Sequence, residues 1–252
     1  MRTVAIVLTA VLLWPLAAAA QEIRVMISGA FSAPFVEVIP EFERAAKYRI
    51  VTIAGASMGG APDSIPVRLE RGEPADVVIM AATALDDLIA QGKVVAGSRV
   101  DLVRSSIGMA VRAGAPKPDI SSVDALRRTL LAAKSIAYSA SASGVYISTE
   151  LFPRLGIADQ VRGKSRRIES ERVGAVVARG DAEIGFQQIS ELLPIAGIDY
   201  VGPLPAEVQR VTIFSAGVAA GSTQRDAARA LIDFLASPRV TPAIRKSGLE
   251  RP

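Results

Sequence analysis

Segments with the pattern of a β-strand alternate with segments with the pattern of an α-helix along nearly the whole chain. The run 75–80 is apolar apart from Asp76, which is typical of a strand buried on both faces of a parallel sheet. A buried helical stripe is predicted earlier in the chain by apolar residues at helical spacing: Phe31, Phe35, Val38 and Phe42. This alternation predicts an α/β fold in which helices cover both faces of mainly parallel sheets.

The strand and helix segments form two sets rather than one. The first set occupies residues 22–91 and the second occupies residues 135–187. A long strand-like segment at 100–112, with Ser105 and Ser106 in its middle, lies between them. The length of the chain permits one domain or two, and two small sets joined by a strand with polar residues favour two lobes.

The first twenty residues are predicted to be a cleaved secretory signal peptide. Arg2 gives a positive start, residues 4–16 form an apolar run, and residues 17–20 are small. The alternative is an uncleaved membrane anchor, but the run is near the lower length limit for a spanning helix. We expect a periplasmic mature protein that begins at Gln21 and, without Trp14, shows only tyrosine-type emission.

Two absences from the composition exclude much of enzyme chemistry. The chain has no cysteine, which excludes disulfides, thiolate metal sites and cysteine nucleophiles. It has no histidine, which removes the commonest general base, the Ser-His-Asp triad and most zinc sites. We therefore expect no metal and no cofactor. The formal net charge of +4, or +3 once Arg2 is removed, is too small and scattered to predict a nucleic-acid partner.

Four junctions between a predicted strand and a predicted helix are rich in serine and glycine. They lie at 28–32, 55–64, 139–146 and 170–172. Ligands of parallel α/β sheets bind beyond the carboxyl ends of strands, where amides at helix starts attract anions. A serine at a helix start is usually only an N-cap, but four such loops together predict a site for a small anion.

Two side chains near these loops could each either contact the ligand or have only a structural role. The guanidinium of Arg172 could give two parallel hydrogen bonds to a carboxylate, or it could be a surface cation paired with Glu169 or Glu171. Tyr146 could contact the ligand or could be a half-buried packing residue. The sequence leaves both alternatives open.

The order of these loops resembles the molybdate-type solute-binding proteins of ABC importers. The most specific segment is 69–79, Leu-Glu-Arg-Gly-Glu-Pro-Ala-Asp-Val-Val-Ile, and the segments 143–146, 155–156 and 185–188 are also similar to that family. The resemblance implies a type II periplasmic binding protein fold, with two mainly parallel sheets joined by two crossover strands. It implies lobe 1 at 21–104 plus 211–252 and lobe 2 at 105–210, in a protein that we expect to be a monomer.

The candidate ligand-binding residues come from these loops and from the end of the last strand of the second set. They are Ser28, Gly29, Ala30, Phe31, Ser32, Ser57, Met58, Ser141, Ser143, Gly144, Val145, Tyr146, Arg172 and Gln188.

Departures from the family's pattern bear on the ligand. Ala30 stands where the family usually has a serine, Gln188 stands where it usually has a tyrosine, and the second loop has an extra segment at 58–62. A molybdate site would lose donors through these changes, whereas a larger planar anion would suit the enlarged loop and Arg172. The first function that we predict is therefore the binding of an organic di- or tricarboxylate for the membrane subunits of an ABC-type importer, with molybdate or another oxyanion as a lesser alternative.

A second function comes from exported aconitate isomerase-like proteins that are similar to this family. Such an enzyme binds a tricarboxylate and moves an allylic proton, which requires one base and no metal. Glu171 and Tyr146 are the candidate bases. Fold alone does not separate a binding protein from an isomerase, because function is carried by the site.

Overall fold

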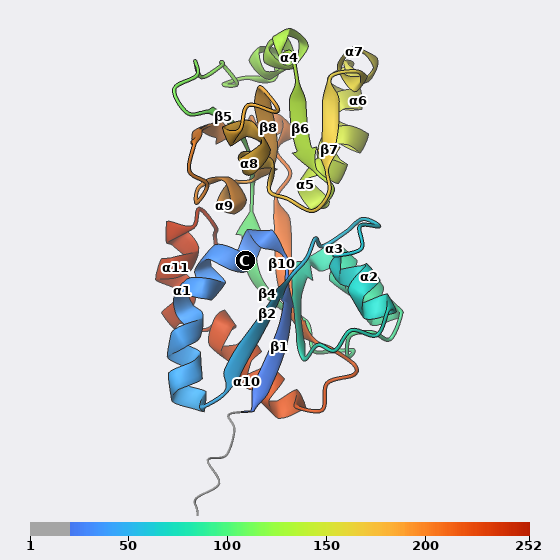
Figure 1. The fold of residues 1–252 in the computed structure, drawn as a ribbon, viewed down its shortest axis with the longest axis vertical. Helices are drawn as coiled ribbons and strands as arrows, with labels where there is room; N and C mark the ends of the chain where they lie inside the picture. Colours follow the sequence, from blue (N-terminus) through green and yellow to red (C-terminus); the bar gives the residue numbers. More distant parts are fainter. Residues whose placement is uncertain (1–20) are drawn as a thin grey trace, which may run out of the picture.

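The structure, a computed structural model, describes residues 21–252, so the predicted signal peptide lies outside the described residues. Two lobes lie one above the other along the long axis of the molecule, each built on its own five-stranded sheet (Figure 1). The two-lobed α/β fold predicted from the sequence is confirmed. No helix among residues 21–252 is both long and apolar enough to cross a membrane.

The first sheet has the strand order β2-β1-β3-β10-β4. Its strands are β1 (Glu22–Ile27), β2 (Arg49–Ala54), β3 (Val77–Ala81), β4 (Val100–Ser105) and β10 (Thr212–Val218). Strand β1 pairs in parallel with β2 and β3, whereas β10 runs antiparallel to β3 and β4. The sheet is therefore mixed, because β10 enters the lobe from the opposite direction to the strands that precede helices.

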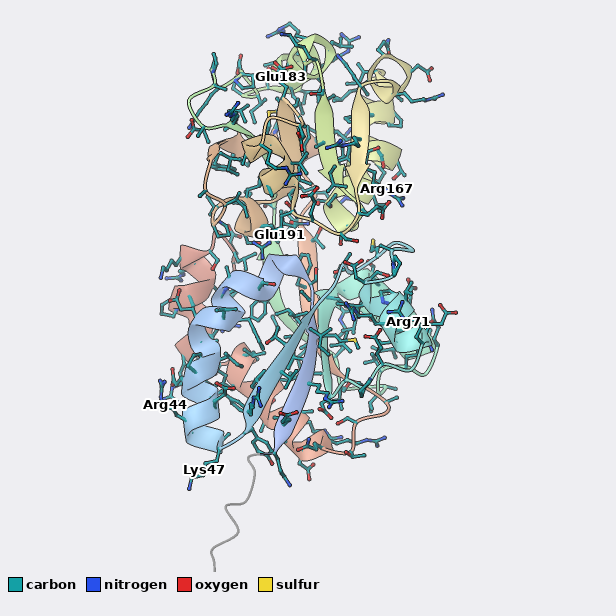
Figure 2. The ribbon with its side chains drawn as sticks, in the orientation of Figure 1. Arg44, Lys47, Arg71, Arg167, Glu183 and Glu191 are labelled. Carbon is teal, nitrogen blue, oxygen red and sulfur yellow. The ribbon has the colours of Figure 1, made fainter. Side chains whose placement is uncertain are left out.

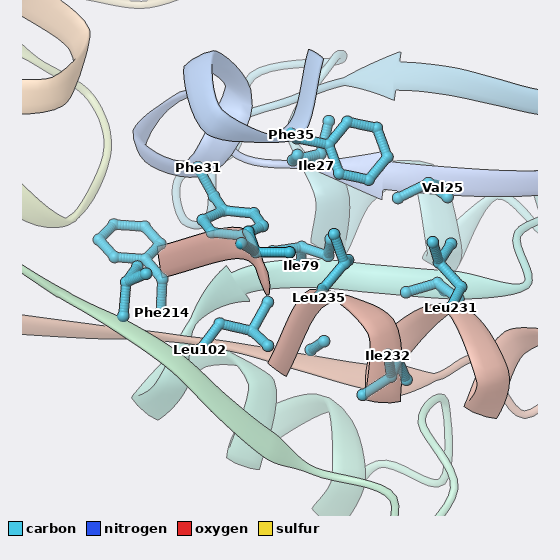
Figure 3. Close-up of a cluster of buried hydrophobic side chains, with 14 of the residues drawn as sticks. Val25, Ile27, Phe31, Phe35, Ile79, Leu102, Phe214, Leu231, Ile232 and Leu235 are labelled. Carbon is cyan, nitrogen blue, oxygen red and sulfur yellow. The ribbon is translucent and has the colours of Figure 1, made fainter. Parts of the chain in front are cut away.

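A hydrophobic core lies on each face of this first sheet, between the strands and the helices that pack on them. One face packs against α1 (Gly29–Ala46), α10 (Arg225–Ala236) and α11 (Thr241–Lys246), and the side chains drawn in Figure 3 form its core. The other face packs against α2 (Ile65–Glu70) and α3 (Ala82–Ala90). In β3, Val77 and Ile79 enter the first core while Val78 and Met80 enter the second. The apolar run is thus buried on both faces, as its composition predicts.

The second sheet has the strand order β7-β6-β8-β5-β9. Its strands are β5 (Ile107–Arg112), β6 (Ile136–Ser139), β7 (Ser165–Ile168), β8 (Ile184–Gln188) and β9 (Ile198–Pro203). One core packs against α4 (Val123–Ala132), α5 (Ala142–Tyr146), the π-helical turn η1 (Ile147–Leu151), α6 (Phe152–Arg154) and α7 (Ala158–Arg162). Helix α8 (Val173–Ala178) covers the other face, and α9 (Ile189–Leu192) follows β8 directly. Here β5 is the strand that pairs antiparallel with its neighbours, β8 and β9.

The chain crosses between the lobes twice, and two glutamines hold the crossings together. Only Ser106 separates β4 from β5, and the turn η2 (Ala206–Val208) lies between β9 and β10. The Ser105 hydroxyl donates to Oε1 of Gln188 (2.7 Å), and Nε2 of Gln188 donates to the hydroxyl of Thr212 (3.4 Å). Gln209 exchanges two hydrogen bonds of 2.9 Å with the backbone of Ile107. Gln188 thus links the end of β4 to the start of β10, and Gln209 links the segment before β10 to the start of β5.

Candidate anion-binding cleft

A cleft of about 210 Å³ lies where the two lobes meet. The residues that line it come from loops at the carboxyl ends of strands in both lobes, the place where α/β folds bind ligands. They are Ser28, Gly29, Ser32, Ala54, Gly55, Ala56 and Asp63 from the first lobe, and Ser139, Ala140, Ser141, Glu169, Ser170, Glu171, Arg172, Gln187 and Glu191 from the second.

The wall on the first lobe is the N-terminus of α1, a helix of 18 residues. Ser28 is its N-cap, and the Ser28 side chain makes no capping hydrogen bond. The first amides of a helix have no acceptor within the helix, and the helix dipole adds positive potential at the same end. Gly29 and Ser32 in this first turn line the cleft. This wall is therefore suited to hold a carboxylate group.

The wall on the second lobe is formed by Arg172 and Gln187. Arg172 is the N-cap of α8 and lies partly buried on the cleft, and its guanidinium has no hydrogen-bond partner among the described residues. Gln187 is buried, and its Oε1 accepts a hydrogen bond from the amide of Val173 (3.0 Å). A guanidinium that keeps its donors for the cleft can form two parallel hydrogen bonds with a carboxylate.

Glu191 lies between these two walls, at the junction of the lobes (Figure 2). It belongs to the first turn of α9, and its Oε1 accepts a hydrogen bond of 2.9 Å from Nε2 of Gln187. Burial raises the pKa of the Glu191 carboxyl from about 4.5 to about 7, while the charge of Arg172 and the bond from Gln187 act in the opposite direction. The site therefore contains a carboxyl group that changes its protonation state near neutral pH.

Two hydrogen bonds join the lobes around the cleft. The amide of Ser57 donates to Oγ of Ser141 (3.2 Å), and the hydroxyl of Ser170 donates to Oδ1 of Asp63 (3.0 Å). Each bond connects a loop of the first lobe to a loop of the second. A ligand that contacts both walls would act in the same direction as these bonds and favour the closed arrangement.

The structure brings together five of the candidate binding residues on this cleft: Ser28, Gly29, Ser32, Ser141 and Arg172. Six others line neither this cleft nor the second cavity described below: Ala30, Phe31, Ser57, Ser143, Gly144 and Gln188. Ala30 and Phe31 pack into the core, and the Ser57 hydroxyl accepts a hydrogen bond from the amide of Ala81 (2.9 Å).

The remaining candidates in the third loop make contacts within their own lobe. The hydroxyls of Ser143 and Ser139 form a buried hydrogen bond of 3.0 Å. A Cβ atom at Gly144 would stand 1.6 Å from the carbonyl oxygen of Ser139, so a glycine is required there for the helix to approach the strand. These contacts shape the loop that presents Ser141 to the cleft.

Three candidates, Met58, Val145 and Tyr146, line a second cavity of about 340 Å³ beside the strand β10. The Tyr146 hydroxyl donates to the carbonyl of Val208 (2.6 Å), and the Arg210 guanidinium lies 4.8 Å from the centre of the ring. Burial raises the pKa of Tyr146, so its hydroxyl stays protonated at neutral pH and is unsuited to accept a proton.

Glu171, the other candidate base, is exposed at the rim of the cleft. Both of its oxygens accept hydrogen bonds from Arg179, at 2.9 and 3.1 Å. These bonds hold the pKa of Glu171 below its usual value. A carboxylate that is engaged by a guanidinium is a weak base. Among residues 21–252, no group of three or more acidic side chains is placed to hold a metal ion.

Comparison with known proteins places the chain in a family. A family model described as bacterial extracellular solute-binding protein matches residues 23–250. The chain belongs to this family. The chain is 50% identical to an aconitate isomerase of a Pseudomonas species over 228 residues, which cover 90% of this chain and 87% of the relative. It is 26% identical to the molybdate-binding protein ModA of Azotobacter vinelandii over 92% of this chain and 91% of the relative.

Solved structures show the same fold. The periplasmic molybdate-binding protein of Azotobacter vinelandii matches with a TM-score of 0.73 and 20% identity, over 91% of this chain and 99% of that chain. The sulfate-binding protein SubI of Mycobacterium tuberculosis matches with a TM-score of 0.72 and 20% identity, over 92% and 87% of the two chains. The resemblance to molybdate-type binding proteins that the sequence indicates is therefore confirmed, and the fold is that of type II periplasmic binding proteins.

Proposed function

We propose that this protein is an aconitate isomerase that binds the tricarboxylate between its lobes and interconverts the cis and trans forms. The observation that carries the proposal is the 50% identity with an aconitate isomerase over 90% of the chain. The isomerase, our second function from sequence alone, is thus favoured over binding for an importer.

The two walls of the cleft support a ligand with several carboxylates. The N-terminus of α1 offers backbone amides on one side, and Arg172 offers a guanidinium on the other. These donors belong to different lobes, so an anion with carboxylates at its two ends can contact both at once. Such bridging would hold the reacting carbons in a fixed place between the walls.

The reaction requires an acid–base group and no redox partner. Aconitate has a methylene carbon next to a carbon–carbon double bond. A base removes one methylene proton, the double bond shifts by one carbon, and the protonated base, whose proton exchanges with water, delivers a proton to the carbon at the far end of the allylic system. No atom is gained or lost, and one carboxyl group can perform both proton transfers.

Incubation of the purified protein with each aconitate isomer, followed by proton NMR, tests the proposal. We expect conversion from either isomer to the same equilibrium mixture and incorporation of deuterium from heavy water into the methylene position. Sulfate and molybdate serve as control anions that fit the fold but contain no carbon skeleton. Tight binding of aconitate without any conversion would contradict the proposal.

Delivery of a carboxylate to an importer is the second candidate, favoured by the match of residues 23–250 to the solute-binding family. Calorimetric titration with a series of di- and tricarboxylates distinguishes it, since a pure binder releases every ligand unchanged. We further propose export through the predicted signal peptide, lobes at 21–104 plus 211–252 and at 105–210, and a monomeric protein. Intact mass and light scattering of secreted material test the export and the monomeric state.

A further inference from the structure

We infer that Glu191 is the proton-transferring residue of the cleft, an inference that rests on the proposed isomerase function. The carboxyl group of Glu191 would remove the methylene proton of the bound tricarboxylate and then, as the protonated acid, deliver a proton to the opposite carbon. Neither the composition nor any motif of the sequence singles out this residue.

The first argument compares the four carboxyl groups that line the cleft. Asp63 accepts a hydrogen bond from Ser170, Glu169 accepts one from Arg167 (2.8 Å), and Glu171 is held by Arg179. Two of these three, Glu169 and Glu171, are exposed and bound by guanidinium groups. The carboxyl groups of Asp63 and Glu191 are bound only by neutral donors among the described residues. Of these two, Glu191 is the one whose carboxyl lies against the N-terminus of α1.

The second argument concerns orientation. Oε1 of Gln187 is fixed by the amide of Val173, so the amide nitrogen of Gln187 must point toward Glu191. That nitrogen donates to Oε1 of Glu191, and Oε2 has no hydrogen-bond partner among residues 21–252. The bonded oxygen positions the side chain, while the second oxygen stays available for a proton. Gln187 thus acts as a positioning residue for Glu191.

The third argument comes from the opposite wall. A Cβ atom on Gly29 would stand 2.0 Å from Oε1 of Glu191, so the carboxyl of one lobe lies directly against the helix start of the other. The absence of a side chain at position 29 is what permits this approach. A ligand carboxylate bound at the N-terminus of α1 would consequently lie beside Glu191. The methylene carbon bonded to that ligand carboxylate is the carbon that must lose a proton.

Electrostatics agrees with this placement. The pKa of Glu191 is raised to about 7 by burial, close to the value at which one group accepts and returns a proton with equal ease. Of the other charged groups that line the cleft, Arg172 lowers the pKa of Glu191, Asp63 is partly buried, and Glu169 and Glu171 are exposed. Helix α1 presents only uncharged residues to the cleft: Ser28, Gly29 and Ser32.

The step is balanced without any co-reactant. The C–H bond of the methylene group breaks as the carboxylate of Glu191 forms an O–H bond. The electron pair moves through the allylic system, with its negative charge spread onto a substrate carboxylate that faces α1 or Arg172. A new C–H bond then forms at the far carbon, and Glu191 returns to its carboxylate form.

Replacement of Glu191 by glutamine separates binding from chemistry. We expect Glu191→Gln to bind trans-aconitate within about threefold of the wild-type affinity, while kcat and the rate of deuterium incorporation fall at least about 100-fold, the scale of a lost general base. Glu70→Gln makes the same chemical change at an exposed site outside the cleft and should keep the wild-type rate. Glu171→Gln tests the competing carboxyl: a fall in kcat much smaller than that of Glu191→Gln supports the inference, and an equal or larger fall overturns it.

The outcomes distinguish this inference from the proposed function. If the wild-type protein converts aconitate and Glu191→Gln does so at a similar rate, Glu191 is not the proton carrier, although the isomerase function stands. A wild-type protein without turnover would overturn both. Equal losses of affinity and kcat/KM, with kcat unchanged, would make Glu191 a binding residue and overturn the inference. If Glu191→Gln fails to fold, Glu191→Asp replaces it, and a shifted pH optimum of kcat supports the inference, whereas an unchanged optimum and rate overturn it.

Discussion

Oε1 of Glu191 lies so close to the Cα of Gly29 that a Cβ atom there would stand 2.0 Å from it. We therefore expect Gly29→Ala to rotate the Glu191 side chain away from the N-terminus of α1. The carboxyl end is flexible, so the stability should change by less than about 1 kcal/mol, since an alanine replaces a glycine in a helix. Turnover of aconitate should fall much further than the affinity for it.

Gly163→Ala is the matched control for this substitution, because a Cβ atom at Gly163 would have no neighbour within 4 Å. Chemical denaturation and aconitate kinetics of the two variants give the comparison. Full activity in Gly29→Ala would mean that the position of Glu191 against α1 has no part in the reaction.

Arg172 provides a test of the carboxylate wall. Its side chain forms no capping bond at α8 and lies on the cleft, so Arg172→Ala should leave the free energy of unfolding nearly unchanged. The affinity for a tricarboxylate should fall by about 2 kcal/mol, roughly 30-fold, which is the scale of a lost charge-assisted hydrogen bond. Calorimetry against Arg128→Ala, an exposed arginine on α4, measures the effect. Equal affinity in the two variants would remove Arg172 from the site.

The fold could be predicted because the alternation of strand-like and helix-like patterns is repeated along the chain. The run at 75–80 predicts a doubly buried strand, and the alternation of β3 residues between two cores confirms it. The segment 100–112, which we expect to be one strand, is two strands in different sheets, separated by Ser106. The sequence does not predict the edge strand β7. This strand pairs with a neighbour on one side only, and its exposed Arg166 and Arg167 give it no apolar strand pattern.

The site was harder to predict because it depends on contacts between distant loops. Ser28 and Arg172 could be predicted because ligands of α/β sheets bind beyond the carboxyl ends of strands, and the structure places both residues on the cleft. Glu191 lies in a helix of only 4 residues and has no motif around it. Its role depends on Gly29 and Gln187, which are 162 and 4 residues away in the sequence. A local pattern contains no information about such a contact.

Gln188 is predicted here to act at the crossings between the lobes rather than on the ligand. It accepts a hydrogen bond from Ser105 and donates one to Thr212, both at strand ends where the chain changes lobe. Gln188→Leu should leave the buried Ser105 hydroxyl without a partner and lower the free energy of unfolding by about 1–3 kcal/mol. Urea denaturation measures this loss. Unchanged stability together with weaker ligand binding would instead support the ligand contact expected from sequence.

The raised pKa of Glu191 also predicts how stability depends on pH. Since the folded protein holds this proton up to about pH 7 and the unfolded chain only to about pH 4.5, the free energy of unfolding should fall as pH rises through this interval. Paired carboxylates such as Glu73 and Glu171, whose pKa values are lowered, lose their contribution only below this interval. The chain has no histidine, so no imidazole titrates in the same range.

Glu191→Gln should therefore remove most of this pH dependence and leave the protein more stable than the wild type at about pH 8. Urea denaturation of the wild type, Glu191→Gln and Glu70→Gln at about pH 5, 6.5 and 8 tests this, with Glu70→Gln expected to follow the wild type. A wild-type stability that does not fall over this range would mean that Glu191 titrates at an ordinary pKa. In that case the carboxyl would be fully ionised at neutral pH, and the bound tricarboxylate itself would have to raise the pKa for proton return.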